Sequence, residues 1–135
     1  MTRMKLSNYT DLEMARQGLI PADRVRTLEL DALVDTGAVD LVLPADVVNM
    51  LGLQEVDRRT VVLADGSPRK VSKVSGLLLE ILGRKMGSDA YVVPEGAKAL
   101  IGQIQLEDLD LVVDARSREL RTNPESPDKP TGTLY

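Results

Sequence analysis

Apolar residues recur along the chain in short runs separated by turn-forming and charged residues. Runs of about four to eight residues that are rich in Val, Ile and Leu are typical of β-strands. The pattern predicts strands over residues 4–9, 25–34, 60–64, 71–82, 90–93, 100–101 and 111–114. We therefore expect a mainly β protein.

Three segments carry helix signals instead. Thr10 is placed as an N-cap and Glu13 closes a capping box, which predicts a helix near the N-terminus. Pro44 stands where a second helix begins, and Gly52 ends it. A third short helix is expected over residues 104–109.

The strongest turn signal is the Asp65-Gly66 pair, which lies between two apolar segments. Such a pair is typical of the tip of a β-hairpin. Pro68 follows closely, so we expect a tip that is looser than a two-residue turn.

The length and composition indicate how many domains the chain can form and which classes of partner it can bind. At 135 residues, 43% of them apolar, the chain is long enough for one domain with a modest core, and that core must be aliphatic because Phe and Trp are absent. The net charge of −4 and the interspersed charges predict neither nucleic-acid nor membrane binding. The N-terminus lacks a signal-peptide pattern, and charges interrupt every apolar run.

Missing residue types narrow the chemistry. The lack of Cys excludes thiol nucleophiles and Cys-ligated zinc and fits a cytoplasmic protein, and the lack of His excludes serine triads and His-ligated zinc. Acid–base chemistry therefore falls to Asp, Glu, Lys or Tyr. We interpret Glu107, Asp108 and Asp110 as a solvated face, and we expect no metal and no cofactor.

One stretch combines an apolar strand with an acid at a bend, since residues 33–34 precede Asp35-Thr36-Gly37. An isolated Asp after a strand is typical of a residue that caps backbone amides in a turn. Here the hairpin signal follows along the chain, and an apolar-apolar-Gly element stands at residues 100–102. This order favours a functional role for Asp35.

In that order and spacing the chain resembles the retropepsin-like aspartic proteases, in particular the small stand-alone bacterial members of that clan. The resemblance covers residue 25 to about residue 123 and implies a closed retropepsin-like β-barrel with one or two short helices. It also implies a homodimer, because a single Asp-Thr-Gly gives a monomer half a site. We expect an N-terminal strand and helix extension (1–24), the protease domain (25–122) and a Pro-rich C-terminal tail (123–135) that is either frayed or docked on a partner.

The resemblance also implies the site residues. The catalytic acid falls on Asp35, the hydroxyl that ties the two loops together on Thr36, and the glycine that substrate backbone approaches on Gly37. The substrate-binding positions fall on Ala38, Asp40, Ala64, Asp65, Gly66, Ser67, Ile101 and Gly102. Residues 64–68 would form the flap that closes over a substrate.

Some of these positions keep a second interpretation. Asp40 either lines a substrate pocket or is an ordinary solvated loop acid. Gly66 is either a flap tip or only a hairpin residue, and Gly102 is either part of the active element or a strand end with a close backbone neighbour. Ala38 cannot offer the hydroxyl that related enzymes supply to the dyad, and we expect a pH optimum on the acidic side of neutral.

The chain departs from the viral pattern in two places. Viral members commonly pair an Arg after the apolar-apolar-Gly element with an Asp after the active loop, and here these positions are Gln103 and Val39. Because both partners of this ion pair are absent, we expect other contacts to pack the active loop against the apolar-apolar-Gly element. The flap carries Asp65, Arg69 and Lys70 where viral flaps are glycine-rich and apolar.

Two functions remain from this reasoning. The first is a homodimeric aspartic endopeptidase that cleaves a protein or peptide substrate. The second is a catalytically silent module of the same fold that binds an extended peptide or serves in assembly.

Overall fold

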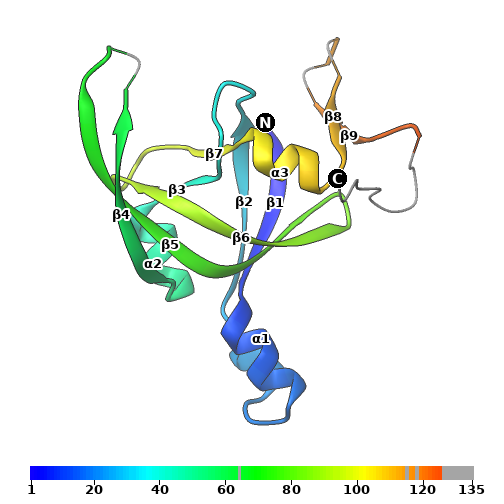
Figure 1. Ribbon diagram of the computed structural model, residues 1–135. Coiled ribbons are helices and arrows are strands. Elements are labelled where there is room, and N and C mark those ends of the chain that lie inside the picture. The colour runs from blue at the N-terminus through cyan, green and yellow to red at the C-terminus, as the bar shows by residue number, and fades with distance from the viewer. Residues whose placement is uncertain (64, 115, 118, 126–135) are drawn as a thin grey trace, which may run out of the picture.

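The structure is a computed structural model that describes residues 1–63, 65–114, 116–117 and 119–125 (Figure 1). Most of the tail expected over 123–135 thus lies outside the described residues. In chain order the elements are β1 (Thr2–Asn8), α1 (Tyr9–Arg16), the 3₁₀ turn η1 (Ala22–Arg24), β2 (Thr27–Val34), β3 (Val42–Pro44), α2 (Ala45–Leu51), β4 (Gln54–Val62), β5 (Pro68–Ile81), β6 (Arg84–Val93), β7 (Ala99–Ile101), α3 (Gln103–Asp108), β8 (Leu111–Val113) and β9 (Leu120–Thr122).

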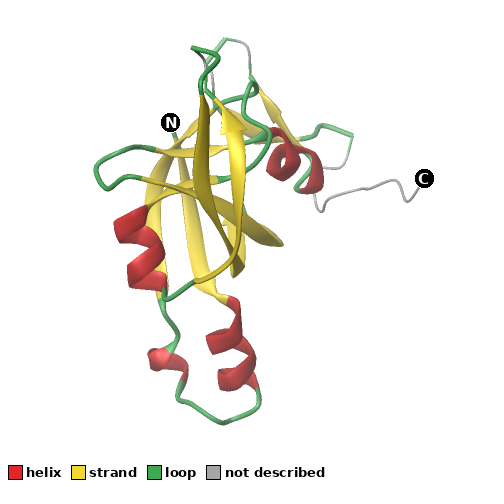
Figure 2. Ribbon diagram, turned by 60° about the vertical axis from the view of Figure 1, so that its left-hand side comes forward, coloured by secondary structure: helices red, strands yellow, loops and turns green. Residues whose placement is uncertain are grey.

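Six strands of the described chain close into a barrel. Hydrogen-bonded neighbours follow the order β1, β2, β7, β3, β6 and β5, and β1 also pairs with β5, which completes the ring. The β2–β7 and β3–β6 pairs are parallel, and β4 extends the sheet as a third partner of β5. Figure 2 shows the helices outside the barrel. The expectation of a mainly β protein with a closed barrel is therefore confirmed, but the described residues form three short α-helices rather than one or two.

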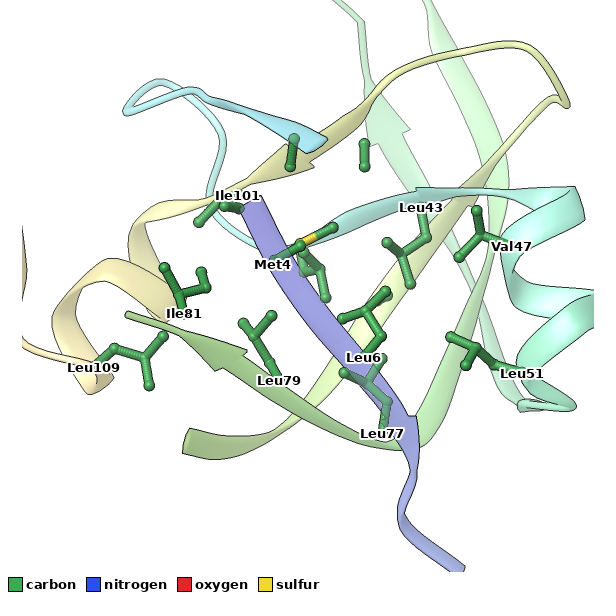
Figure 3. Close-up of a cluster of buried hydrophobic side chains, with 14 of the residues drawn as sticks. Met4, Leu6, Leu43, Val47, Leu51, Leu77, Leu79, Ile81, Ile101 and Leu109 are labelled. Carbon is green, nitrogen blue, oxygen red and sulfur yellow. The ribbon is translucent and has the colours of Figure 1, made fainter. Parts of the chain in front are cut away.

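The barrel interior is aliphatic (Figure 3). Removing such side chains from water contributes roughly 1.5–3 kcal/mol for each fully buried Leu or Ile. The largest fully buried apolar side chains are those of Met4, Leu6, Leu41, Leu43, Leu51, Leu77, Leu79, Ile81, Ile101 and Leu109. Two of them belong to β1, which lies between β2 and β5, so the N-terminal strand is a wall of the barrel.

The first helix begins earlier than the sequence predicts. Asn8, and not Thr10, is the N-cap, because its Oδ1 accepts a 2.9 Å hydrogen bond from the Asp11 amide. The Asn8 Nδ2 also donates to the Leu51 carbonyl at 2.8 Å. The buried Asn8 side chain thus accepts one hydrogen bond and donates another, and together these bonds fix the point at which β1 ends and α1 begins.

The other two helices begin and end close to their predicted positions. α2 has Pro44 as its N-cap and ends at Gly52, whose φ of 65° is the left-handed conformation that glycine adopts without strain. α3 begins one residue before the predicted start, with Gly102 as its N-cap. In the described part of the chain, no helix is long and apolar enough to cross a membrane.

β4 and β5 form the hairpin expected around the Asp-Gly tip, but the hairpin is longer than predicted. β4 starts at Gln54 rather than Thr60. Its residues are mostly exposed because it lies outside the closed ring, so burial does not impose an apolar alternation on it. A register shift between Val74 and Leu77 lets β5 pair with β4 along one part and with β1 along another.

Candidate active site

The Asp-Thr-Gly loop leaves the barrel at the end of β2. The Asp35 amide donates to the Ile101 carbonyl at 3.1 Å, and the Asp35 carbonyl accepts from Ala38 at 3.0 Å, which closes a turn. The Asp35 carboxylate accepts a 2.9 Å hydrogen bond from the Gly37 amide through Oδ1. Asp35, Thr36 and Gly37 are all exposed, so the loop presents its acid at the surface of the barrel.

The loop is anchored from below by β7 and the start of α3. β2 and β7 run parallel with Val34 opposite Ile101. Beyond them, the Gln103 amide donates to the Ala38 carbonyl at 2.8 Å, and the Ile104 amide donates to the Val39 carbonyl at 2.9 Å. Ile101, which is fully buried, therefore lies directly beneath the loop that carries the acid.

Gly102 lies against the backbone of Asp40. A Cβ atom at residue 102 would stand 2.5 Å from the Asp40 nitrogen and 2.6 Å from its carbonyl oxygen. Real Cβ atoms do not approach backbone atoms so closely, so this position requires glycine. The structure thus brings together two residues, Asp40 and Gly102, that the sequence placed at the site separately.

Asp40 is half-buried and held by a buried amide. The Gln105 Nε2 donates to Asp40 Oδ1 at 2.6 Å and to the Ser88 hydroxyl at 3.1 Å, and the Leu41 amide donates to the same carboxylate oxygen at 2.8 Å. Asp40 is therefore not an ordinary solvated loop acid. Sequence reasoning missed Gln105, and the only available signal was a polar residue inside the predicted short helix 104–109.

A groove of about 970 Å³ runs between this loop and the β4–β5 hairpin. Figure 1 shows the hairpin end and the β2–β3 loop at the same end of the molecule. Gly37, Ala38 and Asp40 line the groove, whereas Asp35 and Thr36 stand outside its lining. Its apolar walls include Val42, Val61, Val71, Val93, Leu100 and Ile104.

The hairpin tip is built from polar residues that hydrogen-bond one another. The Ser67 amide and hydroxyl donate to Asp65 Oδ1 at 2.9 and 2.6 Å, and these hydrogen bonds lower the pKa of Asp65. Gly66 adopts a φ of 83° and donates its amide to the Leu63 carbonyl. The tip is exposed and does not itself line the groove, and Ala64 lies outside the described residues.

Basic side chains line the hairpin side of the groove: Arg59, Arg69, Lys70 and Lys73. Arg59 Nε lies 3.0 Å from Asp57 Oδ2. The side-chain hydrogen bond to Asp57 raises the pKa of Arg59, and a smaller effect of the same sign comes from Tyr91. The Lys73 ammonium lies 3.8 Å from Asp89 and 5.5 Å from the centre of the Tyr91 ring. Of these cations, sequence reasoning noticed Arg69 and Lys70 and missed the two that pack around Tyr91.

The acids near the C-terminal end of α3 do not gather into a metal site. The Asp110 carboxylate accepts a 2.9 Å hydrogen bond from the Asn123 side chain. Among the described residues, no group of three or more acidic side chains could hold a metal ion. Neither a protein-family model nor a curated protein matches this sequence.

Proposed function

We propose that the protein is a homodimeric aspartic endopeptidase with a retropepsin-like fold. The observation that carries the proposal is the exposed Asp-Thr-Gly loop, which is anchored on Ile101 and Gly102 and adjoins a groove that the arms of a hairpin line on its other side. The acid, the groove and the hairpin come from three separate parts of the chain. Their meeting at one end of a closed barrel supports a site for an extended peptide.

The chemistry needs a second Asp35 from another protomer. Two carboxylates a few ångströms apart cannot both ionise easily, so they share one proton and titrate as a coupled pair. One carboxylate then takes a proton from water while the other donates one to the scissile carbonyl oxygen. The sequence has one Asp-Thr-Gly, and its exposure on the protomer supports a pairing of this kind across a two-fold axis.

The β4–β5 hairpin would serve as the flap. Its two arms line the groove through Val61, Val62 and Val71, while its tip makes hydrogen bonds mainly within itself. A hairpin end whose tip makes few contacts with the rest of the barrel can open for a substrate and close to exclude water.

The absence of Cys in the sequence supports a cytoplasmic location for the enzyme.

A second function is a module of the same fold that binds a peptide without cleaving it. The observation that favours it is the Asp35 carboxylate, whose Oδ1 already accepts from the Gly37 amide while Asp35 stands outside the groove lining. In such a module the groove would hold an extended segment by backbone hydrogen bonds and side-chain contacts. Asp35 would then only shape its own loop.

The test is cleavage of a mixed pool of unstructured peptides, followed by mass spectrometry from acidic to neutral pH at high protein concentration. The endopeptidase gives products that vanish in Asp35→Asn, with an optimum on the acidic side of neutral. Asp31→Asn, which changes an exposed carboxylate on β2, is the matched control and keeps full activity. Absence of products from folded protein, with peptide binding that survives Asp35→Ala, would establish the binding module instead.

A further inference from the structure

Three cations project from one face of the β4–β5 hairpin. In its antiparallel register Arg59 lies opposite Val71, Arg69 opposite Val61, and Lys73 opposite Asp57. Directly opposite residues share a face of a β-ladder, and residues two apart on a strand do so as well. The three cations therefore stand on the same face as Val61 and Val71. All five of these residues line the groove, whereas Asp57 on the same face does not.

These cations differ in how far neighbouring groups neutralise them. Arg59 is paired with Asp57, and Lys73 lies near Asp89 and over the Tyr91 ring. Arg69 is exposed and has no ion-pair partner in the described part of the chain. Arg69 is thus the cation on this face whose charge remains available to a ligand.

The groove holds little negative charge to oppose Arg69. Asp40 is the acid among the described residues of its lining, and the Gln105 amide and the Leu41 amide already occupy its Oδ1. On this face of the hairpin, three basic side chains line the groove against one acid, in a protein whose net charge is −4. A groove whose charge is opposite in sign to that of the whole protein attracts anionic segments.

We infer that the groove selects peptides with a Glu or Asp side chain, whose carboxylate pairs with the Arg69 guanidinium. Aliphatic residues of the peptide next to this acid would pack on Val61 and Val71. This inference rests on the proposed function in taking a peptide as the ligand. A guanidinium binds a carboxylate with two parallel hydrogen bonds, which gives geometric selection as well as charge attraction. The apolar walls favour a peptide with aliphatic residues next to the acid over a free small anion.

The test uses three peptides of one cleavable aliphatic sequence that carry Glu, Gln or Lys at a single varied position, scanned along the peptide. With the wild-type protein, kcat/KM for the Glu peptide at the best position is at least about tenfold above that for the Lys peptide, and added salt reduces this ratio. Arg69→Glu reverses the order of the Glu and Lys peptides, each measured relative to the Gln peptide with the same variant. Arg24→Glu, the same change on η1, keeps the wild-type order.

Binding to Asp35→Asn, measured by fluorescence anisotropy of the same peptides, separates this inference from the proposed function. Tighter binding of the Glu peptide that is lost in Arg69→Glu supports the inference even if wild-type protein cuts none of them. Cleavage of all three peptides at equal rates, with equal binding, overturns the inference and leaves the endopeptidase in place.

Discussion

Asp40 and Gln105, 65 residues apart in the sequence, are joined by a 2.6 Å hydrogen bond between the side-chain amide and the carboxylate. This bond ties α3 to the loop that carries Asp35. Val39 and Gln103, where viral retropepsin-like proteases commonly carry an Asp–Arg ion pair, are uncharged here. The Val39 side chain is 69% exposed, and the Gln103 side chain donates a hydrogen bond to Glu107. A buried amide and a set of backbone hydrogen bonds therefore hold the loop in this protein.

Gln105→Leu is expected to destabilise the fold by about 1–3 kcal/mol, because the half-buried Asp40 carboxylate and the Ser88 hydroxyl each lose a donor. Urea unfolding at neutral pH measures the loss. Gln103→Leu on the same helix changes an exposed side chain and should shift stability by less than about 0.5 kcal/mol. Equal effects of the two substitutions would show that the Asp40–Gln105 bond does not anchor the loop.

Gly102→Ala is expected to cost about 1–3 kcal/mol, because the added methyl group meets the Asp40 backbone and forces the two segments apart. The same shift displaces the Asp35 loop, so peptide cleavage should fall with stability. Gly87→Ala on β6 is the control, since a Cβ there meets no atom within 4 Å. If Gly102→Ala unfolded at the wild-type urea concentration, the close approach of these two segments would be refuted.

Asp11 and Arg26 predict part of the acid sensitivity of the fold. The Arg26 side chain donates to Asp11 at 2.8 and 3.0 Å, and these hydrogen bonds lower the pKa of Asp11. Because the native pKa lies below the unfolded value of about 3.9, the stabilisation is complete above that pH and is lost as pH falls through the lowered native pKa.

The matching variant is Asp11→Asn, compared with wild type by urea unfolding at a series of pH values. The stability gap should be largest at neutral pH and should close below about pH 4. Asp31→Asn removes an exposed pair with Arg3 and should show a smaller gap at every pH. A gap for Asp11→Asn that stays constant down to strongly acidic pH would contradict the assignment.

The proposed site, if two protomers share it, would make activity depend on protein concentration. Dilution should lower the specific activity of cleavage as dimers dissociate, and added peptide ligand should restore dimers by mass action. Sedimentation over the same concentrations gives the fraction of dimer. Constant specific activity in a range where only monomer sediments would rule out a site made by two protomers.

The barrel could be predicted from the sequence because its strands are buried on the inner face and show as aliphatic runs. β5 and the residues before Asp35 are of this kind. The Asp-Gly tip and the α2 boundaries at Pro44 and Gly52 carry local conformational signals that the fold does not override. These expectations, which rested on burial or on local conformation, therefore agreed with the structure.

Features that depend on contacts between distant segments could not be predicted in the same way. Asn8 replaces Thr10 as the N-cap because its side chain also reaches the Leu51 carbonyl, which no local pattern reveals. Most of β4 was missed since its side chains are exposed and its partner is β5 alone. Gln105 was missed because a single Gln in a short helix usually faces solvent, so its polarity alone does not mark it as buried.

The most direct test of the shared Asp35 dyad is a mixing experiment. Wild-type and Asp35→Asn protomers are combined at constant total concentration, allowed to exchange, and assayed for cleavage of one peptide. If two Asp35 carboxylates form each site, activity follows the square of the wild-type fraction, and an equal mixture retains about a quarter of the wild-type activity. A linear dependence, with about half the activity in an equal mixture, would show that each protomer carries its own complete site and would contradict the account.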